Sequence, residues 1–356
     1  MTDSQTKETV IGNRKDDHLT VAVTASVEQA DLSNFTNIQL EHNALPELSL
    51  TQIDSSIRFL GKKISMPLMI SSTTGGTPST HTVLRQLAEA AELNKIALCV
   101  GSQRIALEFP ECEKHFHLRD VAPTIPLLAN LGAVQLNYGL NTEHCLKAID
   151  MLDADGFVLH LNPLQECLQA GGNTDFRNLL NKIETLARNL PIPLIVKEVG
   201  CGISLSTAKK LIDAGVSAID VSGSGGTSWA LMEAEMTATN QRQELASSFA
   251  AWGSSTVSLL EQYKDWNYPG KWIIASGGVR SGIDIAKSIA LGASMTGIAL
   301  PFVKAAAKGP DAIISYMDKL RSELLISMFC TGSGSIAALS GAKVVKTGFH
   351  STCAGL

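Results

Sequence analysis

The chain has 356 residues, of which 45% are hydrophobic and 18% are charged, so it can bury a large core and is neither disordered nor fibrous. A formal net charge of -5 and the lack of a basic stripe argue against a nucleic-acid partner. The amino-terminal stretch is polar, the apolar runs are too short to cross a membrane, and no C-x-x-C pair suggests zinc or disulfides. These features predict a soluble, cytoplasmic protein.

Short apolar, β-branched runs alternate with longer helical patterns from about residue 66 onward. Helices are expected at 79–94, 175–190, 205–216 and 281–293, where apolar residues recur at three and four spacing. The expected strands are 67–71, 96–100, 126–130, 156–161, 193–198, 218–222, 272–276 and 295–299. Eight such alternations predict an α/β fold, a closed (β/α)8 TIM barrel with an amino-terminal extension. An open doubly wound sheet is the alternative, but no G-x-G-x-x-G opens the first helix.

We expect one domain over residues 1–356, because composition does not change along the chain. Residues 1–65 form the extension, 66–302 hold the strands and crossover helices of the barrel, and 303–356 supply the last helix and a tail. The longest interval between strands, about 223–271, leaves the face of a barrel on which active sites form. It can equally be surface decoration.

Polar or glycine-rich segments follow all eight expected strands. A single one would mean little, because loops are polar in any barrel. The segments are 71–76, 101–104, 130–135, 160–166, 197–202, 222–229, 276–282 and 299–302. Since the carboxyl ends of parallel strands meet at one face, all eight are expected to converge on one site.

The loops after the last three strands are typical of phosphate binding, because the loops after strands 7 and 8 of a barrel often form a phosphate site. Gly277 and Gly278 allow close backbone approach, and Arg280 adds a positive charge near a helix start. Ser222 and Thr227 can hydrogen-bond a phosphate or a ribityl chain. The plainer alternative is that Arg280 only pairs with a charge at its helix. We favour a bound phosphate cofactor.

Lys197 ends a buried apolar strand, where an ammonium is costly unless an anion or polar ring faces it. Glu198 cannot readily pair with it, because adjacent strand residues point to opposite faces. A lysine at the pyrimidine side of a flavin would stabilise the anionic reduced form. Lys197 is therefore the best local indication of the cofactor.

The segment "HLNPLQE" is suited to a hydrated divalent cation and the diphosphate it bridges. His160 and Asn162 share one face of the strand, and Gln165 and Glu166 follow in the loop. A lone histidine at a strand end is more often a core residue than a catalyst. Here its neighbours favour a binding role.

A second anion site is predicted from two further segments. In "RKDDH", Arg14 and His18 lie on one face if the segment is helical, with Lys15 beside them. Such a basic group in a polar terminus is usually just solvated. The segment "GSQR" adds Ser102, Gln103 and Arg104.

Eight of these motifs, taken together, resemble those of a known enzyme family. "RKDDH", "SSTTGG", "GSQR", "ANLGAVQ", "LHLNPLQE", "VKEVGCG", "GSGGTSW" and "ASGGVRSG" occur in the order and spacing of type 2 isopentenyl-diphosphate isomerase. The chain resembles that family, a flavoenzyme on a (β/α)8 barrel, over about residues 11–302. One departure is Thr73, where many members carry methionine.

The resemblance implies a set of site residues. FMN would be held by Ser72, Thr73, Thr74, Ser102, Asn130, Lys197, Ser222, Thr227, Gly277, Gly278, Val279, Arg280, Ala299 and Leu300. Substrate would meet Arg14, Lys15, His18, Ser102, Gln103, Arg104, His160, Asn162 and Gln165, and Glu166 would bind Mg²⁺. Gln165 and Lys197 would assist catalysis, and Trp229 would wall the hydrocarbon end.

The implied reaction moves a double bond of isopentenyl diphosphate by adding one proton and removing another, without net redox change. No paired carboxylates or dedicated Cys and Glu suggest themselves as the acid and base. In line with the family, we expect reduced FMN to fill that role, with NADPH as the reductant, in a homo-oligomer (tetramer or octamer) without nucleic-acid or membrane partners. The alternatives are another FMN-dependent barrel oxidoreductase and a non-catalytic FMN- or phosphate-binding barrel.

Overall fold

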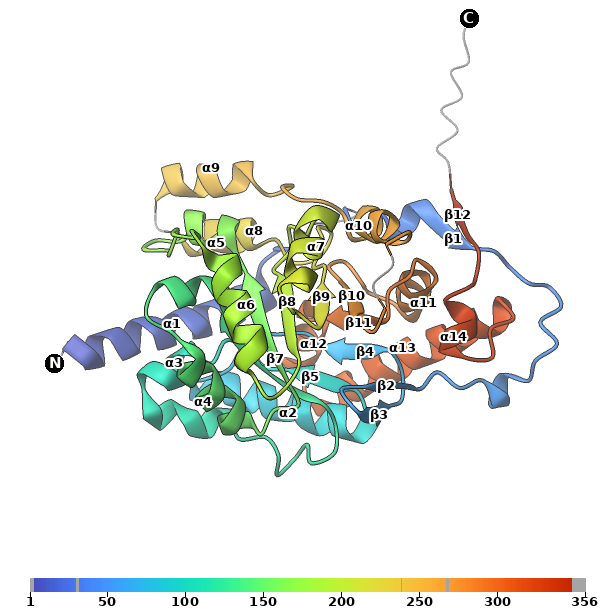
Figure 1. The fold of residues 1–356 in the computed structure, drawn as a ribbon, viewed down its shortest axis with the longest axis horizontal. Helices are drawn as coiled ribbons and strands as arrows, with labels where there is room; N and C mark the ends of the chain where they lie inside the picture. Colours follow the sequence, from blue (N-terminus) through green and yellow to red (C-terminus); the bar gives the residue numbers. More distant parts are fainter. Residues whose placement is uncertain (1–2, 30–31, 238, 267–268, 348–356) are drawn as a thin grey trace, which may run out of the picture.

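The computed structural model describes residues 3–29, 32–237, 239–266 and 269–347, with side chains from residue 12 onward. Its centre is a closed barrel of parallel strands that run in chain order around the axis (Figure 1). The strands are β4 (Leu68–Ile70), β5 (Ala97–Cys99), β6 (Leu127–Gly132), β7 (Gly156–Leu161), β8 (Leu194–Glu198), β9 (Ala218–Asp220), β10 (Trp272–Ser276) and β11 (Met295–Ile298). All eight predicted strands are confirmed, with ends that shift by one or two residues.

Helices surround the barrel, and α2, α4, α7, α10 and α11 begin at side-chain caps. Thr77 accepts a hydrogen bond from the backbone of Thr80 and is followed by proline at the first helical position, which starts α2. The main outer helices are α2 (Pro78–Asn94), α4 (Thr142–Leu152), α6 (Leu179–Asn189), α7 (Leu205–Asp213), α10 (Thr256–Tyr263), α11 (Gly282–Ala290) and α13 (Pro310–Cys330). The four predicted helices correspond to α2, α6, α7 and α11.

Helix α6 begins four residues later than the pattern predicts. The Asp175 side chain accepts a hydrogen bond from the backbone N–H of Arg177 at 3.1 Å. Asn178 then has a left-handed backbone, with φ of 54°. Because an Asx turn competes with helical hydrogen bonding, the chain enters the helix only at Leu179.

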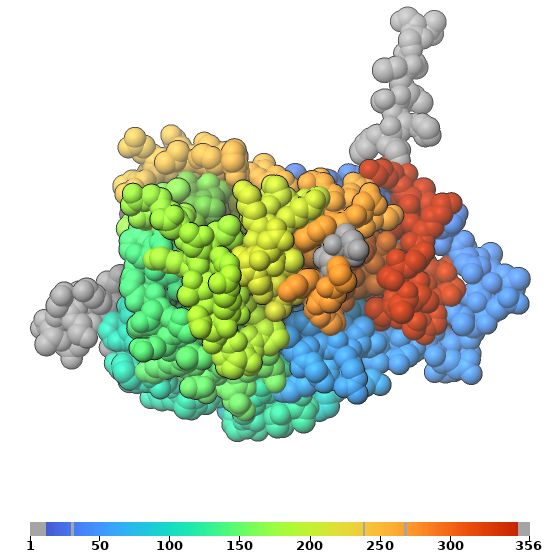
Figure 2. All heavy atoms as spheres, in the orientation of Figure 1, coloured from blue at the N-terminus to red at the C-terminus, as the bar shows by residue number. Residues whose placement is uncertain are grey.

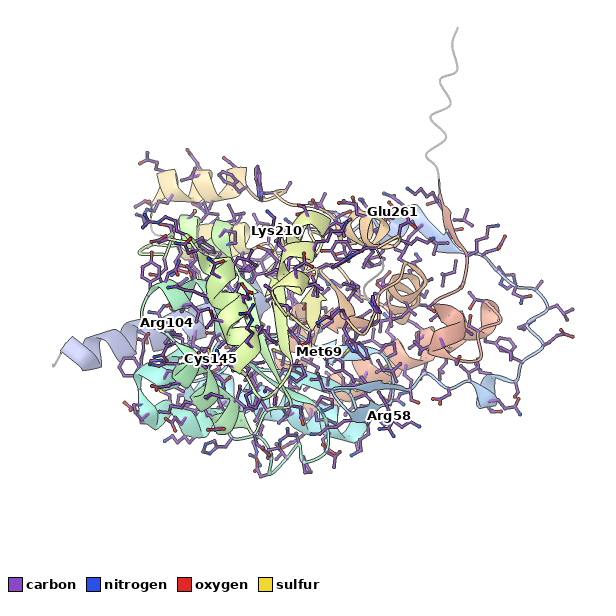
Figure 3. All side chains as sticks on the ribbon, in the orientation of Figure 1. Arg58, Met69, Arg104, Cys145, Lys210 and Glu261 are labelled. Atoms are coloured by element: carbon purple, nitrogen blue, oxygen red, sulfur yellow. The ribbon has the colours of Figure 1, made fainter. Side chains whose placement is uncertain are left out.

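Side chains fill the space between the helices and the strands. Helices α6 and α7 lie over the strands on the face toward the viewer, and Figure 2 shows their atoms closely packed there. In Figure 3, Met69 is labelled among the strands, whereas Arg58 and Lys210 of α7 are exposed residues. Met69 is 1% exposed, in accord with its place in the core.

The interior of the barrel is built in two tiers, because every second residue of a strand points inward. The lower tier is apolar and consists of Met69, Ala97, Leu128, Val158, Ile195, Ala218, Ile274 and Met295. The upper tier lies two residues further along each strand and consists of Ser71, Cys99, Asn130, His160, Lys197, Asp220, Ser276 and Gly297. The upper tier faces the carboxyl ends of the strands, where the polar loops converge.

A hairpin closes the other end of the barrel. Strands β2 (Ile57–Phe59) and β3 (Lys62–Ile64) pair antiparallel, and Phe59 and Ile64 are fully buried against the lower tier. Leu60, in the turn, approaches Gly156 at the start of β7. A separate pair, β1 (Ile38–Leu40) with β12 (Val344–Lys346), joins the extension to the carboxyl-terminal segment.

The amino-terminal extension crosses the open end of the barrel. Helix α1 (Asp3–Thr24) contacts α2, α3 (Arg104–Glu108), α8 (Trp229–Met236) and α12 (Leu300–Ala306). The chain then runs beside the loop after β9, where the backbone N–H of Gln29 donates to Gly226 O and that of Ser228 donates to Val27 O. The extension is thus part of the wall around the polar loops.

The long interval after β9 forms helices α8, α9 (Asn240–Ser248) and α10 in the part of the chain that the structure describes. Helix α8 contacts the amino-terminal helix and α5 (Pro163–Leu168), and α9 contacts α8 and α5 at one edge of the molecule (Figure 1). Within the described ranges, none of the helices combines the length and the apolar character needed to cross a bilayer.

Candidate active site

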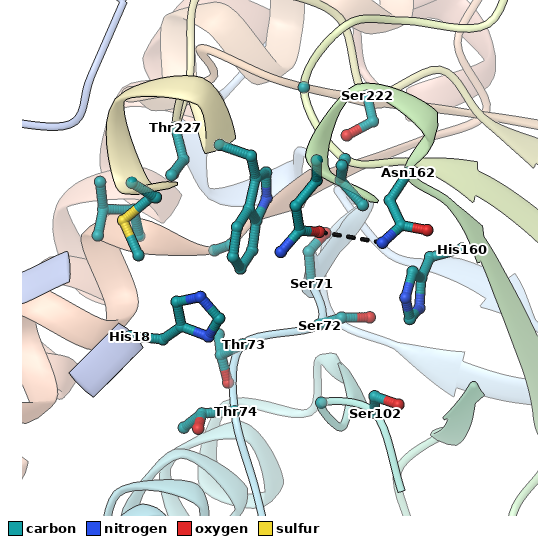
Figure 4. A pocket seen from close by; sticks show the side chains of 18 of the residues that line it. His18, Ser71, Ser72, Thr73, Thr74, Ser102, His160, Asn162, Ser222 and Thr227 are labelled. Carbon is teal, nitrogen blue, oxygen red and sulfur yellow. Dashed lines mark hydrogen bonds between the residues drawn. The ribbon is translucent and has the colours of Figure 1, made fainter. Parts of the chain in front are cut away.

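A cavity of about 320 Å³ opens at the carboxyl ends of the strands, above the upper tier (Figure 4). Residues from α1, from α8 and from the loops after all eight strands line it. The predicted site residues on its wall are Arg14, Lys15, His18, Ser72, Thr73, Thr74, Ser102, Arg104, Asn130, His160, Asn162, Gln165, Glu166, Lys197, Ser222, Thr227, Gly277, Gly278, Arg280, Ala299 and Leu300. One site therefore unites segments that lie far apart in the sequence.

Gln103 and Val279 were predicted at the site, but the structure places both outside the cavity wall. The fully buried Gln103 amide donates to Ala148 O at 2.9 Å and accepts from the backbone N–H of Asn130 at 3.0 Å. Val279 is 1% exposed and packs in the hydrophobic core. The residues on either side of Gln103 and of Val279 line the cavity, whereas Gln103 and Val279 themselves pack on the far side of their loops.

Lys15 brings a mostly buried ammonium to the cavity from α1. Its Nζ donates to the backbone oxygens of Gly75 and of Ser102, the latter at 2.8 Å, and lies 5.8 Å from the ring centroid of Phe116. Burial lowers the pKa of Lys15 to about 8. Because these two hydrogen-bond partners are neutral carbonyls, this cation is suited to an anionic ligand.

Arg14 and His18 lie on the same face of α1, as the helical reading of "RKDDH" predicted, and both approach Glu233 of α8. The Arg14 guanidinium is 3.3 Å from Glu233 Oε1 and also bonds the amide oxygen of Gln169. Burial alone would raise the pKa of Glu233, but the neighbouring His18 and Arg14 outweigh it and hold that pKa below its usual range. Glu233 was missed from the sequence.

The spacing of Glu233, four residues after Trp229, is the sequence signal that could have identified it as a site residue. Residues i and i+4 share a helix face, so a carboxylate there points where the tryptophan points. Trp229 lines the cavity, and its ring meets that of His18 edge to face at a centroid distance of 5.1 Å. Met232 and Leu19 line the same side. This side of the cavity is the apolar one.

His160 lies at the carboxyl end of β7 and points into the cavity (Figure 4). Its Nδ1 is 3.0 Å from Asn130 Oδ1, and the Asn130 amide donates to Ser72 Oγ at 3.1 Å. Burial, with the positive charges of Lys197 and Lys15, lowers the pKa of His160 to about 3. At neutral pH it is an uncharged hydrogen-bonding group.

The start of α5 gathers oxygen ligands. The Asn162 amide donates to Gln165 Oε1 and to Glu166 Oε1, both at 3.1 Å, while its own Oδ1 is buried without a hydrogen-bond partner. Glu166 Oε2 accepts from the backbone N–H of Asn173 at 2.6 Å, and Gln165 donates to Glu233 Oε1 at 3.2 Å. The cluster is thus tied to both α1 and α8 through Glu233.

Lys197 and Glu198 point to opposite sides, as the strand alternation predicted. The Glu198 carboxylate accepts backbone N–H groups of the next four residues at 2.5–3.2 Å, so it shapes the loop after β8. Lys197 lines the cavity and donates to the backbone oxygen of Glu198 at 2.5 Å. The Lys197 residue is 7% exposed and belongs to the upper tier.

The glycine-rich loops after β9 and β10 pack directly on one another. A Cβ on Gly277, whose φ is 95°, would lie 1.9 Å from Gly223 O, so glycine is required by loop packing alone. Ser222, between a strand and this loop, has φ of 41°, a strained conformation for serine at a cavity wall. The loops therefore present backbone to the cavity in a rigid arrangement.

Arg280 pairs with an acid that sequence reasoning missed. Its Nε and NH2 donate to Glu28 Oε1 at 3.0 and 2.6 Å, and Lys304 donates to Glu28 Oε2 at 2.7 Å. Burial opposes the ionisation of Glu28, but both cations together lower its pKa. This group of two cations and one anion retains a positive balance beside the glycine-rich loops.

Two hydroxyl groups of the first loop, Ser71 Oγ and Thr73 Oγ1, are buried at the cavity without hydrogen-bond partners. Buried polar atoms are normally satisfied, so each is suited to a polar ligand. Among the described residues, no group of three or more His, Cys, Asp or Glu side chains could hold a metal by itself. A cation here would need ligands from its substrate beside Glu166.

Comparisons with known proteins agree with this geometry. A model of the FMN-dependent dehydrogenase family matches residues 163–346. An isopentenyl-diphosphate delta-isomerase of Nostoc sp. is 45% identical, and the match covers 92% of this chain and 93% of that one. One of Pseudescherichia vulneris is 43% identical over 95% of this chain and 98% of its own.

Solved structures with the same fold are far less similar in sequence. A mandelate oxidase mutant with a monooxide FMN adduct superposes with a TM-score of 0.62 at 16% identity, covering 97% of this chain and 100% of that one. A mutant flavocytochrome b2 with pyruvate bound gives 0.66 at 17% identity, covering 95% and 85%. At these identities the likeness concerns the barrel fold.

Proposed function

Since the chain belongs to the type 2 isopentenyl-diphosphate delta-isomerases, within the FMN-dependent dehydrogenase family, we propose how its cavity carries out that isomerisation. The reaction interconverts isopentenyl diphosphate and dimethylallyl diphosphate by a 1,3-allylic proton shift. The observation that best supports this proposal is a single cavity with a cation-rich end, an apolar side and a polar floor. Those three surfaces match a diphosphate, a short hydrocarbon and a flavin.

The residues present fit FMN. The unpartnered hydroxyls of Ser71 and Thr73 and the Lys197 ammonium supply polar contacts for a flavin ring. Ser222, Thr227 and the 277–280 loop, with Arg280, would hold the ribityl phosphate. When bound in its reduced form, FMN supplies the acid and base of the reaction. The relatives' family and an FMN adduct in a barrel of this fold support the proposal.

The diphosphate would lie at the end formed by α1 and the loop after β5. Lys15 offers a buried ammonium, and Arg14 and Arg104 add two guanidinium groups to the same wall. His160 and Ser102 contribute uncharged hydrogen-bonding groups. Lys15 is already largely desolvated, whereas the Arg14 and Arg104 side chains remain 30% and 38% exposed.

Glu166 would hold Mg²⁺ against the diphosphate. Its carboxylate lines the cavity, and the unpartnered Asn162 Oδ1 lies in the same cluster. Mg²⁺ commonly takes one or two carboxylates and completes its shell with phosphate oxygens and water, so one Glu is sufficient. The cation would neutralise charge that Lys15 and Arg14 leave uncompensated.

The hydrocarbon end would pack on the apolar side. Trp229, Met232 and Leu19 exclude water from the alkene, which strengthens every electrostatic interaction with the reacting carbons. Gln165 is held by hydrogen bonds to Asn162 and Glu233, so its amide is fixed at the border between the polar and apolar sides. We propose that Gln165 and Lys197 assist the proton shift from these positions.

An anaerobic assay tests this function. The purified protein is checked for a bound yellow chromophore and then incubated with isopentenyl diphosphate, Mg²⁺ and either NADPH or dithionite. We expect dimethylallyl diphosphate only when FMN is reduced, with NADPH sufficient as reductant. FMN bound without product would refute the isomerase assignment and leave an FMN-dependent oxidoreductase. The proposed homo-oligomer, a tetramer or octamer, is tested by analytical ultracentrifugation.

A further inference from the structure

The upper tier contains one carboxylate that the proposed function does not use. Asp220 ends β9 and is 0% exposed. Its Oδ1 accepts a hydrogen bond from Ser276 Oγ at 2.5 Å, whereas its Oδ2 is buried without a hydrogen-bond partner. A half-satisfied carboxylate inside a barrel destabilises the fold unless a charge compensates it. The question is which group does so.

Lys197 is placed to compensate it. The Cα atoms of Lys197 and Asp220 are register partners across the neighbouring strands β8 and β9, and both side chains belong to the inward-facing upper tier. Partners in neighbouring strands lie about 5 Å apart and present their side chains to the same side. Burial raises the pKa of Asp220 above its usual range, and the positive charge of Lys197 is the largest of the contributions that oppose this rise.

The other titratable groups facing Lys197 are uncharged or engaged elsewhere. On β7, the pKa of His160 is lowered to about 3, and on β5 burial raises the pKa of Cys99 to about 12. Glu198, on the same strand, points to the other side and holds the loop after β8. Lys197 and Asp220 are therefore the remaining ionisable pair of the upper tier.

We propose that Asp220 is a positioning residue whose carboxylate keeps Lys197 charged in the barrel interior, so that the ammonium acts on the flavin. This inference rests on the proposed FMN site above the upper tier. Asp220 does not line the cavity and need not touch the cofactor. Its influence passes through Lys197, and the two charges stabilise each other in a medium where neither is well solvated.

Two routes of action predict opposite signs for the reduction potential of bound FMN. If Asp220 acts through Lys197, then Asp220→Asn leaves a buried ammonium that gives up its proton at alkaline pH. The positive charge that favours anionic reduced FMN is then lost, and the potential falls. If the carboxylate acts on the flavin directly, its removal takes away a negative charge and raises the potential at every pH.

The experiment measures the potential of bound FMN in the wild type, Asp220→Asn, Lys197→Met and the double variant at about pH 6 and about pH 8.5, values on either side of neutrality where a buried lysine can lose its proton. At the higher pH we expect Asp220→Asn to lie below the wild type and close to Lys197→Met. In the Lys197→Met background, Asp220→Asn should add nothing. An equal shift in both backgrounds, or a rise at both pH values, would overturn the proposal.

Lys197→Arg provides the matched control, because a guanidinium does not lose its proton in this range. With Arg at this position, Asp220→Asn should no longer lower the potential at alkaline pH; a fall that persists would contradict the mechanism. If Asp220→Asn does not fold, Ser276→Ala removes the hydroxyl that donates to Asp220 Oδ1 and should give a smaller shift of the same sign.

FMN titration of the wild type comes first and separates this inference from the function on which it rests. If the wild type does not bind FMN, the proposed function fails before any potential is compared. If it binds FMN and forms product but Asp220→Asn behaves as the wild type at both pH values, only the role of Asp220 fails.

Discussion

The two tiers of the barrel interior come from the same strands, but they differ in chemistry. The lower tier is apolar throughout and is closed by Phe59 and Ile64 of the β2–β3 hairpin. The upper tier, two residues on, is mostly polar and includes buried oxygens without partners on Ser71 and Asp220. Since unsatisfied buried polar atoms destabilise a fold, the lower tier serves folding and the upper tier serves a ligand.

Lys197→Met tests the upper tier and should have the largest effect. Methionine retains the volume but removes the only ammonium of that tier, so we expect turnover to fall by on the order of 10³-fold and reduced FMN to bind more weakly. The readouts are steady-state turnover and FMN titration. Lys210→Met, on the exposed face of α7, is the control and should retain both. Full turnover in Lys197→Met would refute the assignment.

Ile195→Ala tests the lower tier in the same strand, two residues earlier. The fully packed side chain is 1% exposed, so truncation should cost about 2–5 kcal/mol of unfolding free energy. Denaturant unfolding measures the loss. FMN affinity and turnover below the melting transition should stay near the wild-type values. A variant that keeps its stability but loses the cofactor would remove the distinction between the tiers.

Glu166→Gln tests the cluster above the upper tier. Loss of the carboxylate should weaken the response to Mg²⁺ by on the order of 100-fold, while FMN binding is retained. The Mg²⁺ concentration that gives half-maximal turnover is the measurement. Glu143→Gln, an exposed change on α4, serves as the matched control. Unaltered Mg²⁺ dependence in Glu166→Gln would exclude this residue as the ligand.

The pH profile of kcat/KM tests Lys15, with a smaller effect. Its pKa of about 8 in the free protein means that the ammonium is lost above that pH, so kcat/KM should fall by about tenfold per pH unit where binding requires this charge. Lys15→Arg should retain activity and move the break to higher pH. An unchanged break in Lys15→Arg would assign it to another group.

Stability should not fall together with activity in that window, as far as Lys15 is concerned. The pKa of Lys15 in the folded protein lies below its ordinary value of 10.5, so between about pH 8 and 10.5 the unfolded chain binds more protons than the folded one. Stability from this group therefore rises with pH across that range. Thermal unfolding at several pH values separates the two effects.

Most of the fold was predictable because strand and helix patterns are local. The eight strands and the helices α2, α7 and α11 follow from apolar periodicity and caps within each segment. The start of α6 was predicted wrongly, because an Asx turn at Asp175 outweighs the helical pattern. The placing of site loops at strand ends also followed from the barrel topology alone.

The residues that sequence reasoning missed act across long distances in the chain. Glu233 meets Arg14 from a segment more than two hundred residues away, and Glu28 meets Arg280 across a similar separation. Asp220 stands at the end of an apolar strand, just before the glycine-rich motif that begins at residue 223. Gln103 was predicted to line the cavity, but its amide oxygen accepts a hydrogen bond from the backbone N–H of Asn130 outside the cavity wall.

The sequence by itself determined the barrel, the face on which the site forms, and the family. These properties depend on local periodicity and on short motifs, and both can be recognised in the sequence alone. Only the tertiary structure decided which side chains share charge and hydrogen bonds. Packing brings Glu233, Glu28 and Asp220 beside the cations of other segments. Such pairs depend on distance and burial in three dimensions, and neither quantity can be read from spacing along a chain.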